Sequence, residues 1–178
     1  MGLAERKYTP PPRTGLEVFM MLPEGTPAEL IKDRIYMSPS PTYSHQKISG
    51  ELFVAISNFI QKNDLGVCLA TIDVFFDNKN ILEPDIVFIA KNNLLIIKDD
   101  RIKGSPDLII EILSQGNQSH DLEIKKDVYE RFGIKEYYIV NPKSREVIAY
   151  YLENGKFLQQ YGETGIVKSR LLGNSFLF

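Results

Sequence analysis

Two acidic residues stand inside apolar runs where a charged side chain is costly. Asp85 lies within residues 81–89 and Glu111 within residues 108–113, and both runs are otherwise rich in Ile, Val and Leu. A buried carboxylate costs several kcal/mol unless a cation or hydrogen bonds compensate it. One shared Mg²⁺ (or Mn²⁺) would compensate both, because such ions take one or two carboxylates together with waters. For either acid alone, exposure at a strand end or pairing with a buried Lys or Arg is an equal alternative.

A lysine on the apolar side of a predicted helix points to the same chemistry. Helical periodicity places Lys125 and Asp121 within the apolar side of residues 120–132, whereas Lys126 falls on the charged side. The apolar positions are Leu122, Ile124, Val128, Tyr129 and Phe132. Two interpretations of Lys125 stay open: an ion pair with Asp121 four residues away, or an amine directed at a metal-carboxylate site. Lys126 serves as the outward-facing control.

Asp85, Glu111 and Lys125 together describe a site for phosphodiester hydrolysis. We expect Asp85 and Glu111 to be the metal ligands, where the ion would polarise the phosphate and lower the pKa of a bound water. The ammonium of Lys125 would orient that water or neutralise charge in the transition state.

Composition restricts the class of protein that could carry such a site. The chain has 178 residues, 43% hydrophobic and 25% charged, which fits one globular domain at 16–178 after an extended, proline-bearing arm at 1–15. No apolar run reaches the roughly 20 residues that span a bilayer, so we expect no membrane association and a cytoplasmic location. One cysteine and two histidines exclude a disulfide and a Cys/His zinc cluster. The net charge of -2 supplies no overall attraction for nucleic acid.

The order of predicted elements indicates an α/β (α+β) fold with one central mixed sheet flanked by helices. The pattern predicts helices at 16–22, 42–61 and 120–132, and strands at 28–31, 34–37, 67–76, 81–90, 107–113, 137–140, 147–152 and 156–161.

The same residues carry a resemblance to a known family. The segments are 29–39, 45–48, Glu83-Pro-Asp-Ile-Val87, 104–114, 121–129 and 133–140. They resemble the PD-(D/E)XK nuclease superfamily and, within it, the Uma-two family of restriction endonucleases, over roughly residues 16–178. The resemblance implies a restriction-endonuclease-like αβββαβ core, with Asp85 as the PD aspartate and Glu111 as the second acid. The superfamily pattern expects lysine at position 113, where this chain has leucine. Lys125 looks like its relocated substitute.

Three further residues have more than one interpretation. Asp107 follows a second Pro and lies on the same side of its strand as Glu111, and we expect it beside the site rather than in it. His45 is interpreted as a hydrogen-bonded core histidine in preference to a substrate contact. Glu29 is either an accessory acid near the metal or an exposed hairpin residue.

The predicted function is a metal-dependent endonuclease acting on DNA. The resemblance and the apolar segment 175–178 also indicate a homodimer, although that segment could equally pack inside its own subunit. One alternative is a catalytically silent module with this fold that binds DNA or a protein partner, which Leu113 and the absence of basic charge favour. Another is a hydrolase or lyase acting on a small phosphorylated substrate.

Overall fold

The computed structural model describes residue 11 and residues 14–114 and 120–178, with backbone alone at 120–122. The predicted arm at 1–15 and the polar loop before residue 120 lie largely outside these described residues. Within them the first element is the short helix α1 (Gly15–Phe19). Thr14 caps it: its hydroxyl accepts a hydrogen bond from the Glu17 amide, and the Glu17 side chain accepts one from the Thr14 amide.

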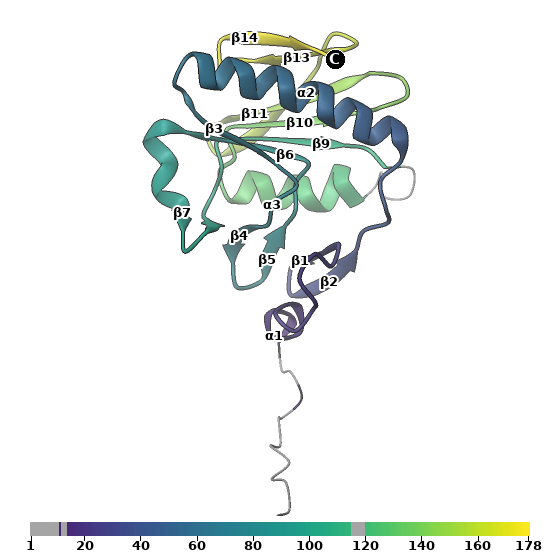
Figure 1. The fold of residues 1–178 in the computed structure, drawn as a ribbon, viewed down its shortest axis with the longest axis vertical. Coiled ribbons are helices and arrows are strands. Elements are labelled where there is room, and N and C mark those ends of the chain that lie inside the picture. Colours follow the sequence, from purple (N-terminus) through teal and green to yellow (C-terminus); the bar gives the residue numbers. More distant parts are fainter. Residues whose placement is uncertain (1–10, 12–13, 115–119) are drawn as a thin grey trace, which may run out of the picture.

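A mixed six-stranded sheet forms the centre of the fold, in the order β12-β11-β10-β9-β6-β3 (Figure 1). Its strands are β3 (Gly66–Ala70), β6 (Ile86–Ala90), β9 (Leu108–Ile112), β10 (Glu136–Val140), β11 (Val147–Glu153) and β12 (Lys156–Tyr161). Within this sheet β9 and β10 form the one parallel pair, and the other neighbouring strands are antiparallel. β9 and β10 are buried along their whole length, as expected of strands covered on both faces.

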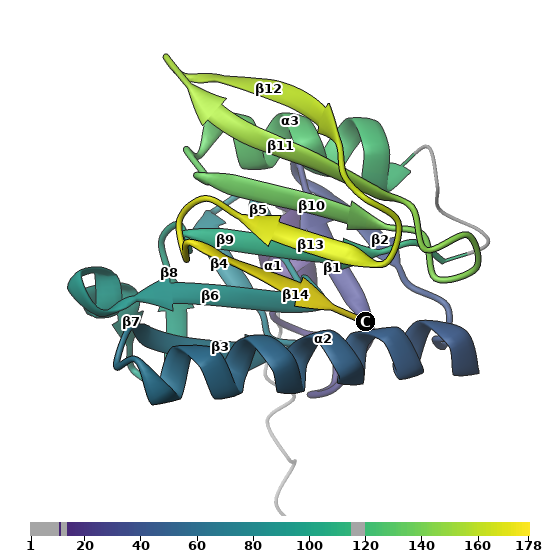
Figure 2. The same cartoon turned by 90° about the horizontal axis from the view of Figure 1, so that it is seen from above.

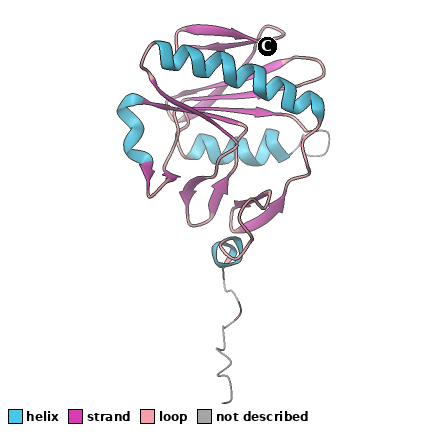
Figure 3. Ribbon diagram, in the orientation of Figure 1, coloured by secondary structure: helices cyan, strands magenta, loops and turns pink. Residues whose placement is uncertain are grey.

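Different elements cover the two faces of the central sheet. The long helix α2 (Tyr43–Lys62) and the hairpin of β13 (Ile166–Ser169) and β14 (Asn174–Leu177) pack on one face. The helical segment made of η2 (His120–Lys125) and α3 (Lys126–Arg131) packs on the other (Figures 1 and 2). The expected central mixed sheet flanked by helices is therefore confirmed (Figure 3).

A second six-stranded sheet, in the order β2-β1-β5-β4-β8-β7, was not expected. It contains β1 (Ala28–Ile31), β2 (Arg34–Met37), β4 (Val74–Asp77), β5 (Asn80–Leu82), β7 (Ile97–Lys98) and β8 (Arg101–Lys103). The short 3₁₀ helix η1 (Lys91–Ile96) leads from β6 into β7. Apolar side chains of this sheet join those of α3 beneath the central sheet, which places β1 close to β9.

The predicted strands at 67–76 and 81–90 are each wrong as continuous elements. The first divides into β3 and β4, which belong to different sheets, and the second divides into β5 and β6. Thr71 adopts a left-handed backbone conformation with φ of 48°, which ends β3. Pro84 has no amide hydrogen to continue a ladder, and it separates β5 from β6. The two breaks place Asp85 in the connection immediately before β6 and not inside the strand that its apolar run had predicted.

The helix predicted at 42–61 and the strands predicted at 137–140, 147–152 and 156–161 are confirmed as α2, β10, β11 and β12. The amide of His45 donates to the Thr42 hydroxyl at 3.3 Å, which caps α2. The buried apolar residues of α2 follow one helical face: Ile48, Leu52, Ile56 and Ile60. Gly66 has φ of 144°, and a side chain there would collide with the backbone of residues 89–91.

The predicted helix at 120–132 has a different first turn. Residues 120–125 form a π-helical turn, and a regular helix follows from Lys126 to Arg131. Such turns are rare and frequently occur at functional sites. Val128 and Tyr129 are buried, as the periodicity predicted.

The apolar segment 175–178 packs within its own chain. Phe176 and Phe178 are buried against α2 and the central sheet, and Leu177 is exposed. This segment therefore gives little support to a homodimer. Among the described helices, none is long and apolar enough to cross a membrane.

Candidate active site

Asp85 immediately precedes β6, beside Glu111 on the neighbouring strand β9. Ile86 pairs with Ile110 in the antiparallel register, so Asp85, one residue before this pair, comes opposite Glu111. The amide of Ile112 donates to Oδ2 of Asp85 at 2.7 Å, which fixes the carboxylate at the sheet. Nε2 of His45 lies 3.3 Å from Oδ1 of the same carboxylate.

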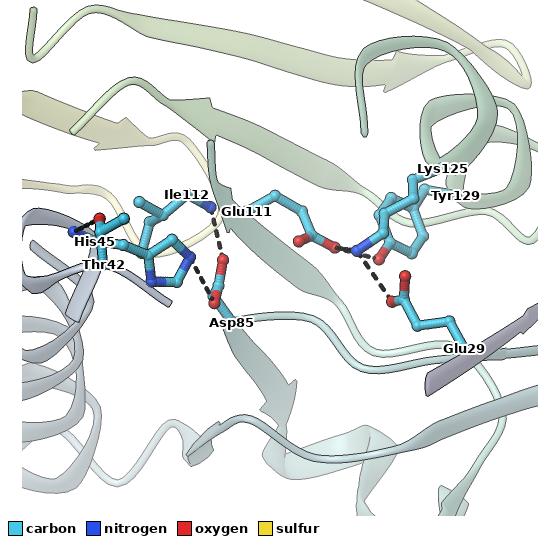
Figure 4. Close-up of polar contacts among 8 residues, drawn as sticks. All are labelled: Glu29, Thr42, His45, Asp85, Glu111, Ile112, Lys125 and Tyr129. Atoms are coloured by element: carbon cyan, nitrogen blue, oxygen red, sulfur yellow. Dashed lines mark hydrogen bonds and ion pairs between the residues drawn. The ribbon is translucent and has the colours of Figure 1, made fainter. Parts of the chain in front are cut away.

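Glu111 lies on the face of the central sheet that η2 and α3 cover, and two residues of this helical segment contact its carboxylate. Its Oε1 accepts hydrogen bonds from Nζ of Lys125 at 3.1 Å and from the Tyr129 hydroxyl at 2.6 Å (Figure 4). Residues four apart share one helical face, which explains why both reach one oxygen. Burial, followed by the nearby charges of Glu111 and Glu29, raises the pKa of the Tyr129 hydroxyl well above its ordinary value. Tyr129 therefore stays protonated and acts as a donor.

Lys125 is buried between carboxylates from two sheets. Nζ lies 2.9 Å from Oε1 of Glu29 on β1 and 3.1 Å from Oε1 of Glu111 on β9. Its side chain is only 7% exposed. The inward direction predicted for Lys125 is what the structure shows, and the amine contacts Glu29 and Glu111. The side chain of Asp121, the alternative partner, lies outside the described residues.

The three predicted site residues line one cleft of about 280 Å³. Figure 4 shows Lys125, Glu111 and Glu29 pointing toward one another, with Asp85 and His45 beside them. The described residues that line the cleft are Gly25, Pro27, Glu29, Ser38, Pro39, Pro41, His45, Gln46, Thr71, Glu83, Asp85, Glu111, Ile112, Ser114 and Lys125. Lys126 is not among them, and its Nζ lies over the Tyr150 ring at 5.5 Å from the centroid.

The cleft holds more negative than positive charge. Its described lining residues include one ammonium, that of Lys125, and four carboxyl groups, those of Glu29, Glu83, Asp85 and Glu111. Burial, followed by the charges of Asp73, Glu29 and Asp85, raises the pKa of Glu83, while Lys125 opposes this shift. The carboxylates therefore repel one another, and a bound cation would relieve that repulsion.

The donors in the cleft fit Mg²⁺ or Mn²⁺ rather than zinc. Across residues 14–114 and 123–178, no group of three or more His, Cys, Asp or Glu side chains is arranged to hold a metal alone. Mg²⁺ requires less, because one or two carboxylates with several waters suffice. Asp85 and Glu111, which both line the cleft, are the pair predicted for this role.

Asp107 is part of a separate structural cluster. It immediately precedes β9, and the four residues from there to Glu111 correspond to about 13 Å of strand. Its carboxylate accepts hydrogen bonds from the Ala90 amide, the Asn93 amide group and the Lys135 ammonium, at 2.6–2.9 Å. The expectation that Asp107 lies beside the site is wrong, because these partners hold it at the opposite end of the strand, outside the residues lining the cleft.

The structure also shows the surroundings of His45 and Glu29, which each had two interpretations. His45 is buried, as expected of a core histidine, and it lines the cleft as well. Glu29 is buried in β1 and is not an exposed hairpin residue. Sequence reasoning assigned Tyr129 to the core alone and gave Glu83 no role. The signal for Tyr129 was its position four residues after Lys125 on one helical face.

Comparisons with known proteins agree with this fold. A family model described as "Putative restriction endonuclease" matches residues 16–173. A crystal structure of a protein from Anabaena variabilis ATCC 29413, described as a "putative nuclease belonging to DUF820", superposes with a TM-score of 0.73. The two sequences are 20% identical, and the match covers 91% of this chain and 92% of that one. No curated protein matches. The match over residues 16–173 places this chain in the Uma2 family of restriction-endonuclease-like proteins.

Proposed function

We propose that this protein is a metal-dependent endonuclease that hydrolyses DNA phosphodiester bonds in the cleft between its two sheets. The observation that carries the proposal is the meeting of Asp85, Glu111 and Lys125 in one cleft, in a chain of a restriction endonuclease family. Enzymes of this class generally use divalent metal ions.

In this proposal each site residue has one task. Asp85 and Glu111 would hold the ion, with Asp85 fixed by the Ile112 amide and Glu111 fixed by the Tyr129 hydroxyl. A bound Mg²⁺ or Mn²⁺ supplies Lewis-acid chemistry toward the phosphate and lowers the pKa of its bound water. Lys125 replaces the lysine missing at position 113 and stabilises the negative charge that develops on the phosphate. Burial of Lys125 strengthens that interaction, because it excludes competing water.

The direct test is cleavage of supercoiled plasmid by the purified protein. We expect nicked or linear product with Mg²⁺ or Mn²⁺ and none with excess chelator. A matched incubation with RNA and with short nucleotides tests the substrate class. Metal-dependent cleavage restricted to small phosphorylated compounds would contradict the proposal and favour a different hydrolase.

We expect DNA binding to be weak and strongly dependent on salt. The net charge is -2, and the cleft is acidic, so the attraction for DNA must come from a few basic side chains near the cleft. Arg101 is one candidate, since it lines a hollow of about 520 Å³ that shares Gly25, Thr71 and Glu83 with the cleft. Affinity should fall at least about tenfold between 50 and 200 mM salt. Titration of labelled duplex in Ca²⁺ measures this, and tight binding that ignores salt would contradict backbone-dominated contact.

A catalytically silent module that binds DNA or a protein partner is the second candidate. Leu113 at the lysine position and the net negative charge favour it. The two functions differ in one result, since a silent module would bind a metal or a partner without cleaving any nucleic acid. A homodimer also remains a prediction, and a measurement of the molecular mass of the protein in solution tests it.

A further inference from the structure

Glu29 lies against Lys125 although the two residues come from different layers of the fold. Oε1 of Glu29, on β1 of the second sheet, is 2.9 Å from Nζ of Lys125, which closes the π-helical turn (Figure 4). The side chain of Glu29 is 5% exposed, and this carboxylate has little access to water. An acid buried so deeply requires compensation, which the ammonium provides.

Glu29 is itself fixed by the backbone. The amide of Glu83 donates to the same Oε1 atom at 2.9 Å, and β1 is buried between β2 and β5. The carboxylate therefore stands in one place before any substrate or ion arrives. Such a fixed charge can orient a flexible lysine side chain, which has several rotatable bonds.

Glu111 cannot hold Lys125 in the same way throughout the proposed reaction. An ion bound to Glu111 would neutralise part of the carboxylate charge that Lys125 contacts at 3.1 Å, and it would weaken this ion pair. Glu29 is the second carboxylate in contact with the ammonium. It would keep Lys125 in the cleft when Glu111 is engaged by the ion.

We propose that Glu29 is a positioning residue that holds the Lys125 ammonium toward the reacting phosphate. This inference rests on the proposed function for its catalytic consequence, but the ion pair itself can be tested without any cleavage. The competing role is that of a further metal ligand. The contact of Glu29 Oε1 with an ammonium and with a backbone amide argues for positioning instead.

The test is the Glu29→Gln variant, which keeps the size of the side chain and removes its charge. We expect kcat to fall about 10- to 100-fold, as is typical when a catalytic group is misplaced by about 1 Å. KM and the affinity for Mn²⁺ should change less than about twofold. In the Lys125→Gln background, Glu29→Gln should cause no further loss, because the effect acts through Lys125.

Glu136→Gln is the matched control, since Glu136 is also buried but lies outside the cleft. It accepts hydrogen bonds from Tyr138, Ser169 and Leu171. Glu136→Gln should destabilise the protein and leave kcat of the folded fraction unchanged. A loss of Mn²⁺ affinity in Glu29→Gln, or additive losses in the double variant, would overturn the positioning role.

A spectroscopic measurement separates this inference from the proposed function. Burial slows exchange of the Lys125 ammonium protons with water, so ¹⁵N-lysine labelling should show its signal in the wild type at neutral pH. The signal should shift or vanish in Glu29→Gln and persist in Glu136→Gln. If the wild type cleaves nothing, the proposed function fails while this result still decides the ion pair. An unchanged signal in Glu29→Gln would overturn the inference even in an active nuclease.

Discussion

Asp85→Ala and Glu111→Ala should each abolish Mg²⁺-dependent cleavage of supercoiled plasmid. Both carboxylates line the cleft, Glu111 from β9 and Asp85 from the residue just before β6, and each is assigned to the same ion. Loss of either ligand should remove about 4 kcal/mol of transition-state stabilisation, which corresponds to about a thousandfold in rate. Initial rates of nicking, measured at saturating Mg²⁺, give the comparison.

Two controls keep this result interpretable. Asp85→Asn and Glu111→Gln retain side-chain size, so equal loss of activity with a near-native thermal unfolding midpoint would exclude a folding defect. Asp107→Asn changes a buried acid that lies outside the cleft, and its folded fraction should remain active. Full activity in Asp85→Asn or Glu111→Gln would refute the assignment of the site.

Lys125→Ala should reduce the cleavage rate about 10²- to 10³-fold and leave metal binding largely intact. The ammonium is assigned to charge that develops in the transition state, so its loss should affect kcat more than substrate binding. Because Lys125 is buried between Glu29 and Glu111, Lys125→Met is a second variant that keeps the apolar stem. Single-turnover cleavage and Mn²⁺ titration of both variants measure the two effects separately.

The adjacent residue supplies the control for Lys125. Lys126 lies over the Tyr150 ring and outside the cleft, so Lys126→Ala should change neither the rate nor metal binding. Equal losses from Lys125→Ala and Lys126→Ala would indicate a nonspecific charge effect. A Lys125→Met variant with the wild-type rate would show that the lysine has no part in the chemistry.

Local periodicity predicted the burial of Glu111 and the inward direction of Lys125. A single acid in the apolar run 108–113 indicated a buried carboxylate, and Glu111 is 4% exposed. Helical spacing separated Lys125 from its neighbour Lys126, and the structure gives them different surroundings. Both features depend on residues a few positions apart, which one-dimensional patterns record well. The roles assigned to these residues remain predictions.

The tertiary partners of these residues could not be predicted in the same way. Glu29 reaches Lys125 only because β1 pairs with β5 and the second sheet packs beneath β9. The division of residues 67–76 between two sheets depends on the left-handed conformation of Thr71. Pairing between distant strands is a property of the whole fold, because side chains far apart in sequence supply the contacts.

Calorimetric titration of Mn²⁺ or Mg²⁺ into the wild type, Asp85→Asn and Glu111→Gln tests the central claim most directly. It asks whether the acidic cleft holds a divalent ion and whether these two carboxylates are its ligands. We expect one ion per chain in the wild type and at least about tenfold weaker binding in each variant. Ion binding of equal strength in all three proteins would contradict the metal-dependent nuclease site.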